Sequence, residues 1–244
     1  MATNDSKEAI IARFDPNGPG IPGNLFGLPF SSEHCELIVV PAPWEVTVSY
    51  RGGAAMGPMA ILDASSQIDL YIKDIPDAWK YGVSMLPVPA DVREEGQNLR
   101  KLSAQHIRRV EQGESVDAED PVLKQINEGC EKFNQYMKST TKQLLKEGKA
   151  VAVLGGDHST PLGFIQALCE QVDRLGILQI DAHADLRRAY EGFTYSHASI
   201  MYNALKMPGV SRLVQLGVRD FCEEEKNNIQ RGVGRIVPFY DEDI

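Results

Sequence analysis

The second half of the chain alternates short apolar strands with short helices, and this alternation constrains the fold more than any other feature. An earlier apolar run, 36–40, is also expected to be a strand, which Pro41 closes. Near-continuous apolar strands between helices are typical of a parallel sheet covered on both faces. The sequence therefore predicts an α/β fold of three layers, with a central, mostly parallel sheet. The later expected strands are 150–154, 175–180, 212–218 and 235–239, and the expected helices between them are 159–171, 199–205 and 223–230.

The first half gives a weaker pattern. Pro58 in the first turn favours a helix over 57–65, and an apolar stripe favours another over 121–148. Proline and glycine crowd residues 15–27, so we expect an irregular N-terminal arm over 1–34 and one folded domain over 35–244. The mixed, charged segment 73–121 suggests an exposed amphipathic helix near 99–110 and is interpreted as an insertion that covers the active site or an interface.

Composition excludes several classes of partner. The chain of 244 residues carries a net charge of −9, which offers no electrostatic footprint for nucleic acid or an anionic membrane. It contains no apolar run of about 18 residues and begins with no signal-peptide pattern, so a cytoplasmic protein is expected. The four cysteines are widely spaced without a CxxC pair, and we expect them to be reduced thiols.

Three of the five histidines lie between residues 158 and 197. His158 follows the strand 150–154 in the segment Gly-Gly-Asp-His-Ser, and His183 follows the strand 175–180 in Asp-Ala-His-Ala-Asp. Ligands of open parallel sheets bind beyond the carboxyl ends of the strands, so both segments should converge on one edge. His197 comes later, in Tyr-Ser-His-Ala-Ser.

The second segment has the chemistry of a metal site. At a spacing of two, Asp181, His183 and Asp185 leave the same face of an extended chain. Two carboxylates and an imidazole that point one way are costly to bury without a cation. Oxygen and imidazole ligands without thiolate suit manganese, iron, nickel or zinc. The alternative is that these residues only cap a turn and a helix, as Asp157 and Ser159 could do beside His158.

These motifs resemble those of the ureohydrolase family, which includes arginase, agmatinase, formimidoylglutamase and guanidinase. Further resemblance lies in Arg51–Ala54 with the following Gly-Pro-x-Ala-Ile and in Leu216–Arg219, so that it covers roughly residues 35 to 240. It implies an arginase-like fold, a trimer or hexamer of identical chains, and hydrolysis of a linear amidine or guanidinium C–N bond with release of urea. A related zinc deacetylase is disfavoured, because Gly-Gly-Asp-His-Ser is not the motif of those enzymes.

The resemblance also implies roles for single residues. His158, Asp181 and Asp185 would ligate one manganese, and Asp181 and His183 a second, with Asp181 bridging the two ions; nickel or another divalent metal could replace manganese. A hydroxide between the metals would attack the guanidinium carbon, and His197 would carry a proton to the leaving amine. The residues that bind the rest of the substrate are not identified.

Two features depart from the family pattern. Ala198 stands where agmatinase-like proteins have glycine after the histidine. The family completes its site with a later Asp-x-Asp motif and a distal acidic residue. After Asp185 the Asp-x-Asp spacing occurs only at 241–243, in an acidic run that we interpret as a solvated loop. We therefore expect a C-terminally incomplete ureohydrolase with an unprotected sheet edge near Ile236. Its substrate could be agmatine-like, a guanidino acid or guanidine, and the alternative function is a fragment that binds one metal or a partner without turnover.

Overall fold

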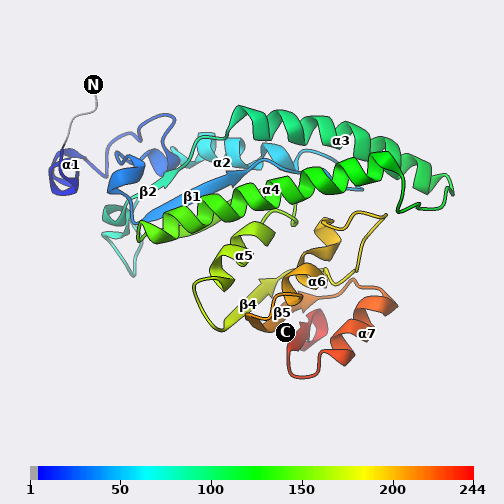
Figure 1. Cartoon of the computed structure of the whole chain (residues 1–244). Coiled ribbons are helices and arrows are strands. Elements are labelled where there is room, and N and C mark those ends of the chain that lie inside the picture. Colours follow the sequence, from blue (N-terminus) through cyan, green and yellow to red (C-terminus); the bar gives the residue numbers. More distant parts are fainter. Residues whose placement is uncertain (1–4) are drawn as a thin grey trace.

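The computed structural model describes residues 5–244 and has an α/β architecture built from parallel strands (Figure 1). The strands are β1 (Leu37–Ala42), β2 (Val83–Met85), β3 (Ala150–Gly155), β4 (Leu175–Ile180), β5 (Val210–Val218) and β6 (Ile236–Tyr240). The α-helices are α1 (Lys7–Arg13), α2 (Gly57–Ser65), α3 (Ala90–Glu111), α4 (Pro121–Lys146), α5 (Leu162–Cys169), α6 (Ile200–Leu205) and α7 (Glu223–Arg231). Among these residues, no helix is both long and apolar enough to cross a bilayer.

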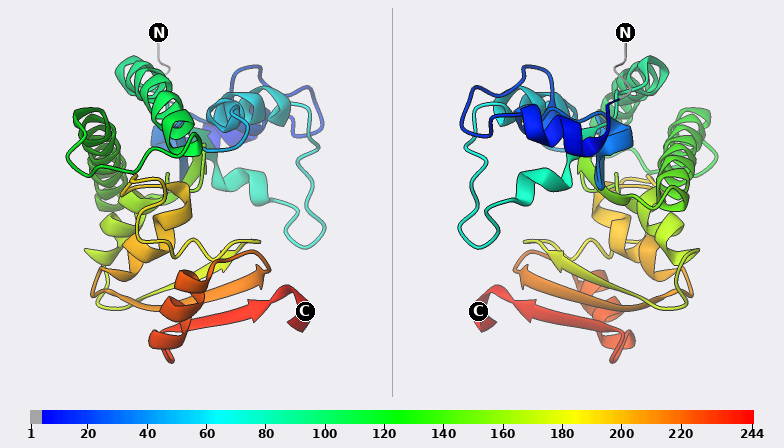
Figure 2. Two further views of the ribbon diagram at one scale, coloured as in Figure 1. Left: turned by 90° about the vertical axis from the view of Figure 1, so that its right-hand side faces the viewer. Right: turned by 90° about the vertical axis from the view of Figure 1, so that its left-hand side faces the viewer.

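The strands form two parallel sheets of three rather than one central sheet. Their orders are β2-β1-β3 and β4-β5-β6, and no pairing joins β3 to β4 in the described part of the chain. Figure 2 shows the β4-β5-β6 sheet set apart from the N-terminal half, with the helices between them on one side only. The unpaired edge expected near Ile236 is present, because β6 pairs with β5 alone, but β3 and β4 are also edge strands.

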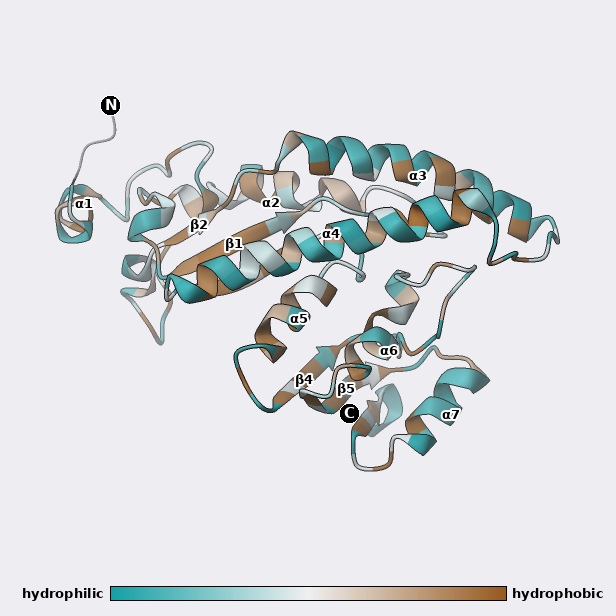
Figure 3. Ribbon diagram, viewed as in Figure 1, coloured by the Kyte–Doolittle hydropathy of each residue, from teal (hydrophilic) through white to brown (hydrophobic). Residues whose placement is uncertain are grey.

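Each sheet packs against its own core. Ile38 and Val40 of β1 are fully buried against α4, whose apolar face repeats with helical spacing. The second core joins Leu213 and Ile236 of β5 and β6 to apolar side chains of α5, α6 and α7. Figure 3 shows the hydrophobic strand β1 beneath helices α3 and α4, whose outer faces are hydrophilic.

Most expected elements are confirmed, and the differences have local causes. The strand β1 runs through Pro41, which was expected to end it. The carbonyl of Val39 faces β2 and accepts a hydrogen bond from the N–H of Leu86. Pro41, two residues later, faces the same side but lies beyond the end of β2. No neighbouring strand therefore needs the missing N–H of Pro41.

The segments assigned to an arm and to an insertion contribute to the N-terminal half of the fold. Residues 5–34 include α1, and Phe14 lies 5.3 Å, centroid to centroid, from the ring of Trp79. Within 73–121, β2 pairs with β1, and the amphipathic helix is the 22-residue α3, longer than its sequence signal. Both α1 and β2 were missed, because each is too short to give a clear periodic pattern.

Candidate metal centre

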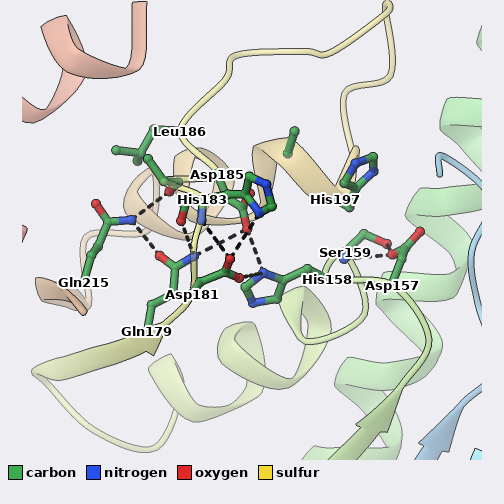
Figure 4. Close-up of polar contacts among 12 residues, drawn as sticks. Asp157, His158, Ser159, Gln179, Asp181, His183, Asp185, Leu186, His197 and Gln215 are labelled. Carbon is green, nitrogen blue, oxygen red and sulfur yellow. Dashed lines mark hydrogen bonds and ion pairs between the residues drawn. The ribbon is translucent and has the colours of Figure 1, made fainter. Parts of the chain in front are cut away.

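The two strand-end motifs meet between the two sheets. His158 follows β3 and Asp181 follows β4, and the His158 Nδ1 lies 3.0 Å from Asp181 Oδ2 (Figure 4). The same nitrogen lies 2.6 Å from Asp185 Oδ2. These three side chains offer ligand atoms that all lie within 4.8 Å of one another, and they are the only such cluster among residues 5–244. Motifs 23 residues apart in sequence thus form one group of metal-type donors.

The charges of this cluster are strongly coupled. Burial disfavours a charged imidazole, but the hydrogen bonds and charges of Asp181 and Asp185 outweigh it and raise the pKa of His158 to about 10. Burial acts to raise the pKa of Asp181 as well, yet the hydrogen bond from His158 and the N–H of His183 hold it well below its usual range. The positive charge of protonated His158 therefore compensates the negative charges of Asp181 and Asp185. A bound divalent cation would compensate the same charges.

A tight turn presents His158. Gly156 has φ of +56°, and a Cβ there would clash with the carbonyl oxygens of Ala42 and Trp44. Asp157 follows, and its N–H donates to the Trp44 carbonyl at 2.8 Å. Asp157 Oδ1 then accepts the N–H of Ser159, also at 2.8 Å, which closes the turn. The capping interpretation is therefore confirmed for the turn at Asp157 but is wrong for Ser159, because α5 begins at Leu162 with Pro161 at its N-cap and no side-chain cap. The turn directs His158 toward the carboxylates.

Two buried glutamines support Asp185. Gln215 of β5 is fully buried and donates to Gln179 Oε1 at 2.6 Å and to the Ala184 carbonyl at 2.7 Å. Gln179 of β4 in turn approaches Asp185 Oδ2 at 3.4 Å and the His183 carbonyl at 3.3 Å through its Nε2 (Figure 4). The Asp185 carboxylate is thus supported by a hydrogen-bond relay that begins on the neighbouring strand, β5.

His183 lies between two carboxylates. Its Nδ1 is 3.3 Å from Asp181 Oδ1, and its Nε2 is 3.8 Å from Asp220 Oδ2. The side chain of Asp220 is largely exposed, as is that of His183. His183 is therefore adjacent to the cluster but is not one of its three convergent donors.

His197 faces the same region from the loop before α6. Its backbone N–H donates to Thr47 Oγ1 at 3.2 Å, and its Nδ1 lies 3.5 Å from that oxygen. It lines a cavity of about 120 Å³ together with His183, Asp185 and Asp220. The structure therefore brings all five sequence-predicted residues to one region, although only His158, Asp181 and Asp185 are in mutual contact.

The donor set suits one divalent cation better than two. One imidazole nitrogen and two carboxylates converge, which is a set that manganese, iron, nickel or zinc accepts. A second ion beside His183 would share Asp181 and find few other donors among the described residues. Asp241 pairs loosely with Arg219 at 3.8 Å, and Asp243 accepts the N–H of Tyr240, so the 241–243 run lies outside the cluster.

The match to known proteins is consistent with this geometry. The model of the Arginase family matches residues 35–241. The chain belongs to the arginase family. It is 28% identical over 197 residues to the N(1)-aminopropylagmatine ureohydrolase of Synechocystis sp., covering 80% of this chain and 54% of that protein. It is 29% identical over 187 residues to the enzyme of the same name from Thermus thermophilus, of which it covers 52%.

Solved structures support the same fold. The agmatine ureohydrolase of Thermoplasma volcanium superposes with a TM-score of 0.64 at 23% identity, over 97% of this chain and 65% of that one. The arginase of Bacillus cereus superposes with a TM-score of 0.57 at 22% identity, over 85% of this chain and 64% of that one. The fold is thus arginase-like. The chain spans about half the length of the curated relatives that it matches.

Sequence reasoning missed the supporting residues around the cluster. Gln179 and Gln215 are polar residues at the centre of apolar strands, and they are direct neighbours in the β4-β5 register. A glutamine in a strand expected to be buried was the available signal, because a buried amide requires a partner. Thr47 gave no comparable signal.

Proposed function

We propose that this chain carries the larger part of a metal-dependent hydrolase that cleaves the C–N bond of a linear amidine or guanidinium and releases urea. Agmatinase-, guanidinase- and arginase-like substrates all fit this class. The observation that carries the proposal is the convergence of His158 on Asp181 and Asp185 at the carboxyl ends of β3 and β4. Family membership supports it independently.

His158, Asp181 and Asp185 would hold one manganese ion, or nickel or another divalent metal. Asp181 and His183 would contribute to a second. When bound, such a metal lowers the pKa of water to about 7 and so supplies a nucleophile at neutral pH. Asp181 reaches both positions, with Oδ2 toward His158 and Oδ1 toward His183.

The remaining polar groups serve the substrate. The carboxylates attract a planar guanidinium cation toward the edge where the two motifs meet. His197, held by Thr47 on the wall of the same cavity, would carry a proton to the nitrogen of the leaving amine. We expect the working enzyme to be cytoplasmic and to assemble as a trimer or hexamer, as the resemblance implies.

Metal stoichiometry tests the proposal first. The purified 244-residue chain is loaded with manganese, desalted and measured by elemental analysis. At least one ion per chain is expected, with loss of binding in Asp185→Asn and normal binding in Asp63→Asn, an exposed carboxylate on α2 that serves as the matched control. Equal binding by the two variants would show that the cluster is not the metal site. A urea-release panel of guanidino amines, guanidino acids, arginine and guanidine then tests activity.

A second candidate function is a protein that binds one metal or a partner without turnover. It is favoured by the three-donor cluster, which could hold one ion and, among residues 5–244, leaves few carboxylates for a second. One tightly bound ion with no urea from any substrate, in the presence of excess metal, would support this alternative.

A further inference from the structure

The loop that carries His197 spans residues 186–199 and is closed at its base. Arg187 donates its N–H to the Ala198 carbonyl at 3.1 Å, so the two ends of the loop lie side by side. Figure 1 shows the loop, in yellow, reaching away from α6 toward α4. Its tip, residues 190–194, contacts side chains of α3 and α4, so the loop connects the two halves of the molecule.

Two side chains hold the backbone of this tip. His106 of α3 is 4% exposed, and its Nε2 donates to the Glu191 carbonyl at 2.8 Å. Because a carbonyl only accepts, Nε2 is the protonated nitrogen of this ring. Asn127 of α4 donates to the Gly192 carbonyl at 3.2 Å and accepts the N–H of Thr194 at 2.8 Å. We call His106 and Asn127 the tip clamp.

The tip has a backbone conformation that needs such support. Glu191 has φ of +54° and Gly192 has φ of +86°, and a non-glycine residue in this region is uncommon. A Cβ on Gly192 would lie 2.7 Å from Val116 and 2.8 Å from Leu123, so the tip lies directly against α4 and the segment before it. Phe193, the next residue, is fully buried. A conformation of this kind persists where the surrounding contacts determine it.

Three consecutive turns carry the position of the tip to His197. The N–H of Phe193 donates to the Tyr190 carbonyl at 2.9 Å. The N–H of Ser196 donates to the Phe193 carbonyl at 3.3 Å, and the N–H of Ser199 donates to the Ser196 carbonyl at 2.9 Å. His197 lies inside the third turn. A displacement of the tip would therefore move His197 as well.

The clamp uses the polar atoms of His106 rather than its shape. The ring of His106 lies 5.2 Å, centroid to centroid, from that of Phe193. A phenylalanine at position 106 would keep this contact without the cost of burying a polar group. The N–H donor is therefore what histidine adds here, and this donor binds the loop.

We propose that His106 and Asn127 are positioning residues, which fix the tip of the loop 186–199 and thereby hold the imidazole of His197 at the wall of the metal-site cavity. Neither residue lines that cavity, so both act through the loop. Thr47 accepts the N–H of His197 at 3.2 Å and supports it from the other side. The catalytic consequence rests on the proposed role of His197, whereas the clamp is measured without metal or substrate.

Matched variants of the full chain separate the donor from the packing. His106→Phe keeps the ring and removes the donor, whereas His106→Gln restores an amide donor near the position of Nε2. Asn127→Ala removes both bonds of the second clamp residue at a half-buried site, so the test does not depend on the folding of His106→Phe. Gln105→Leu, at an exposed position of α3, is the matched control.

Amide hydrogen exchange and histidine NMR are measured on these chains without metal. Exchange at Ser196 and Ser199 should quicken about tenfold in His106→Phe and in Asn127→Ala, since the loss of one buried hydrogen bond changes an opening equilibrium by roughly this factor. The ring signal of His197, identified by its loss in His197→Gln, should move toward that of an unstructured histidine. His106→Gln should restore both properties, and the control should leave both unchanged.

Three results would overturn the proposal. The first is unchanged exchange at Ser196 and Ser199 in both His106→Phe and Asn127→Ala. The second is exchange that quickens equally in β1 and β5, because the clamp would then only stabilise the whole fold. The third is a ring signal of His197 that stays in place although the tip is loosened.

Kinetics distinguish this proposal from the proposed function. With any guanidino substrate that releases urea, kcat of His106→Phe should fall about tenfold at unchanged KM, because a misplaced proton carrier impairs the reaction and not the binding. An unchanged kcat would overturn the catalytic consequence of the clamp. An unaltered chain that releases no urea would count against the proposed function, whereas quickened exchange and a shifted signal of His197 would still support the clamp.

Discussion

The relay from Gln215 through Gln179 to Asp185 gives the sharpest prediction about the cluster. The perturbation is Gln179→Met, which keeps the length of the side chain and removes its amide. It deletes the acceptor of the 2.6 Å bond from Gln215 and the donor that faces Asp185. Gln215 keeps its bond to the Ala184 carbonyl, so one buried N–H of its amide loses its partner.

The magnitude follows from these losses. A buried donor left without a partner costs about 1–3 kcal/mol, and we expect the free energy of unfolding to fall by that amount. A double variant, Gln179→Met with Gln215→Met, removes both partners of the short bond. Its cost should be smaller than the sum of the two single costs by about 1 kcal/mol. Metal affinity should fall about 10–100-fold in Gln179→Met, as is typical when the group that orients a ligand is removed.

Urea unfolding of the four proteins gives the stability cycle, and calorimetric manganese titration gives the affinities. Gln230→Met, an exposed glutamine on α7, is the control for the substitution itself and should match the unaltered chain in both assays. Additive costs in the cycle would refute a coupled pair. Unchanged manganese affinity in Gln179→Met would refute the support of Asp185.

Three further outcomes are expected. Asp181 and Asp185 raise the pKa of His158 to about 10, so manganese must displace the proton of His158 at pH 7. The affinity for manganese should therefore rise with pH, and the heat of binding should depend on the buffer. A heat of binding that does not depend on the buffer would contradict this. Burial raises the pKa of Cys35 to about 11 and that of Cys130 to about 12, so a thiol reagent at pH 8 should label Cys169 and Cys222 first. Mass spectrometry of the labelled native protein measures the order of labelling. Trp44→Ala should cost about 3–5 kcal/mol in denaturant unfolding, because a buried ring stacked on a phenylalanine at 4.3 Å is lost.

Much of the fold could be predicted from local signals. The helix α4 begins at Pro121, with Asp120 as its cap, and carries a long apolar stripe, so its bounds follow from the sequence alone. The strand β4 also matches its expected range, 175–180. The short strand β2 and the helix α1 could not be predicted, because three to seven residues of mixed polarity carry no usable period.

The residues of the candidate metal site could likewise be identified from the sequence, but their arrangement could not. The spacing of Asp181, His183 and Asp185 suggested three side chains on one face, whereas Asp185 adopts φ of +53° and turns its carboxylate to His158. His183 lies between Asp181 and Asp220, and no motif indicated Asp220. A period-two argument assumes extended backbone, and the turn after β4 departs from it.

The sequence by itself indicated five of the six parallel strands of the described chain, the family and the five residues proposed for the site, because periodicity and motif chemistry are local properties. Only the tertiary structure decided that the strands divide into two sheets, that Gln179 and Gln215 support Asp185, and that β3 and β4 are open. Strand order and edge exposure depend on which segments pair across long sequence separations. The free energy of that pairing comes from packing and hydrogen bonds between distant residues, which no local pattern encodes.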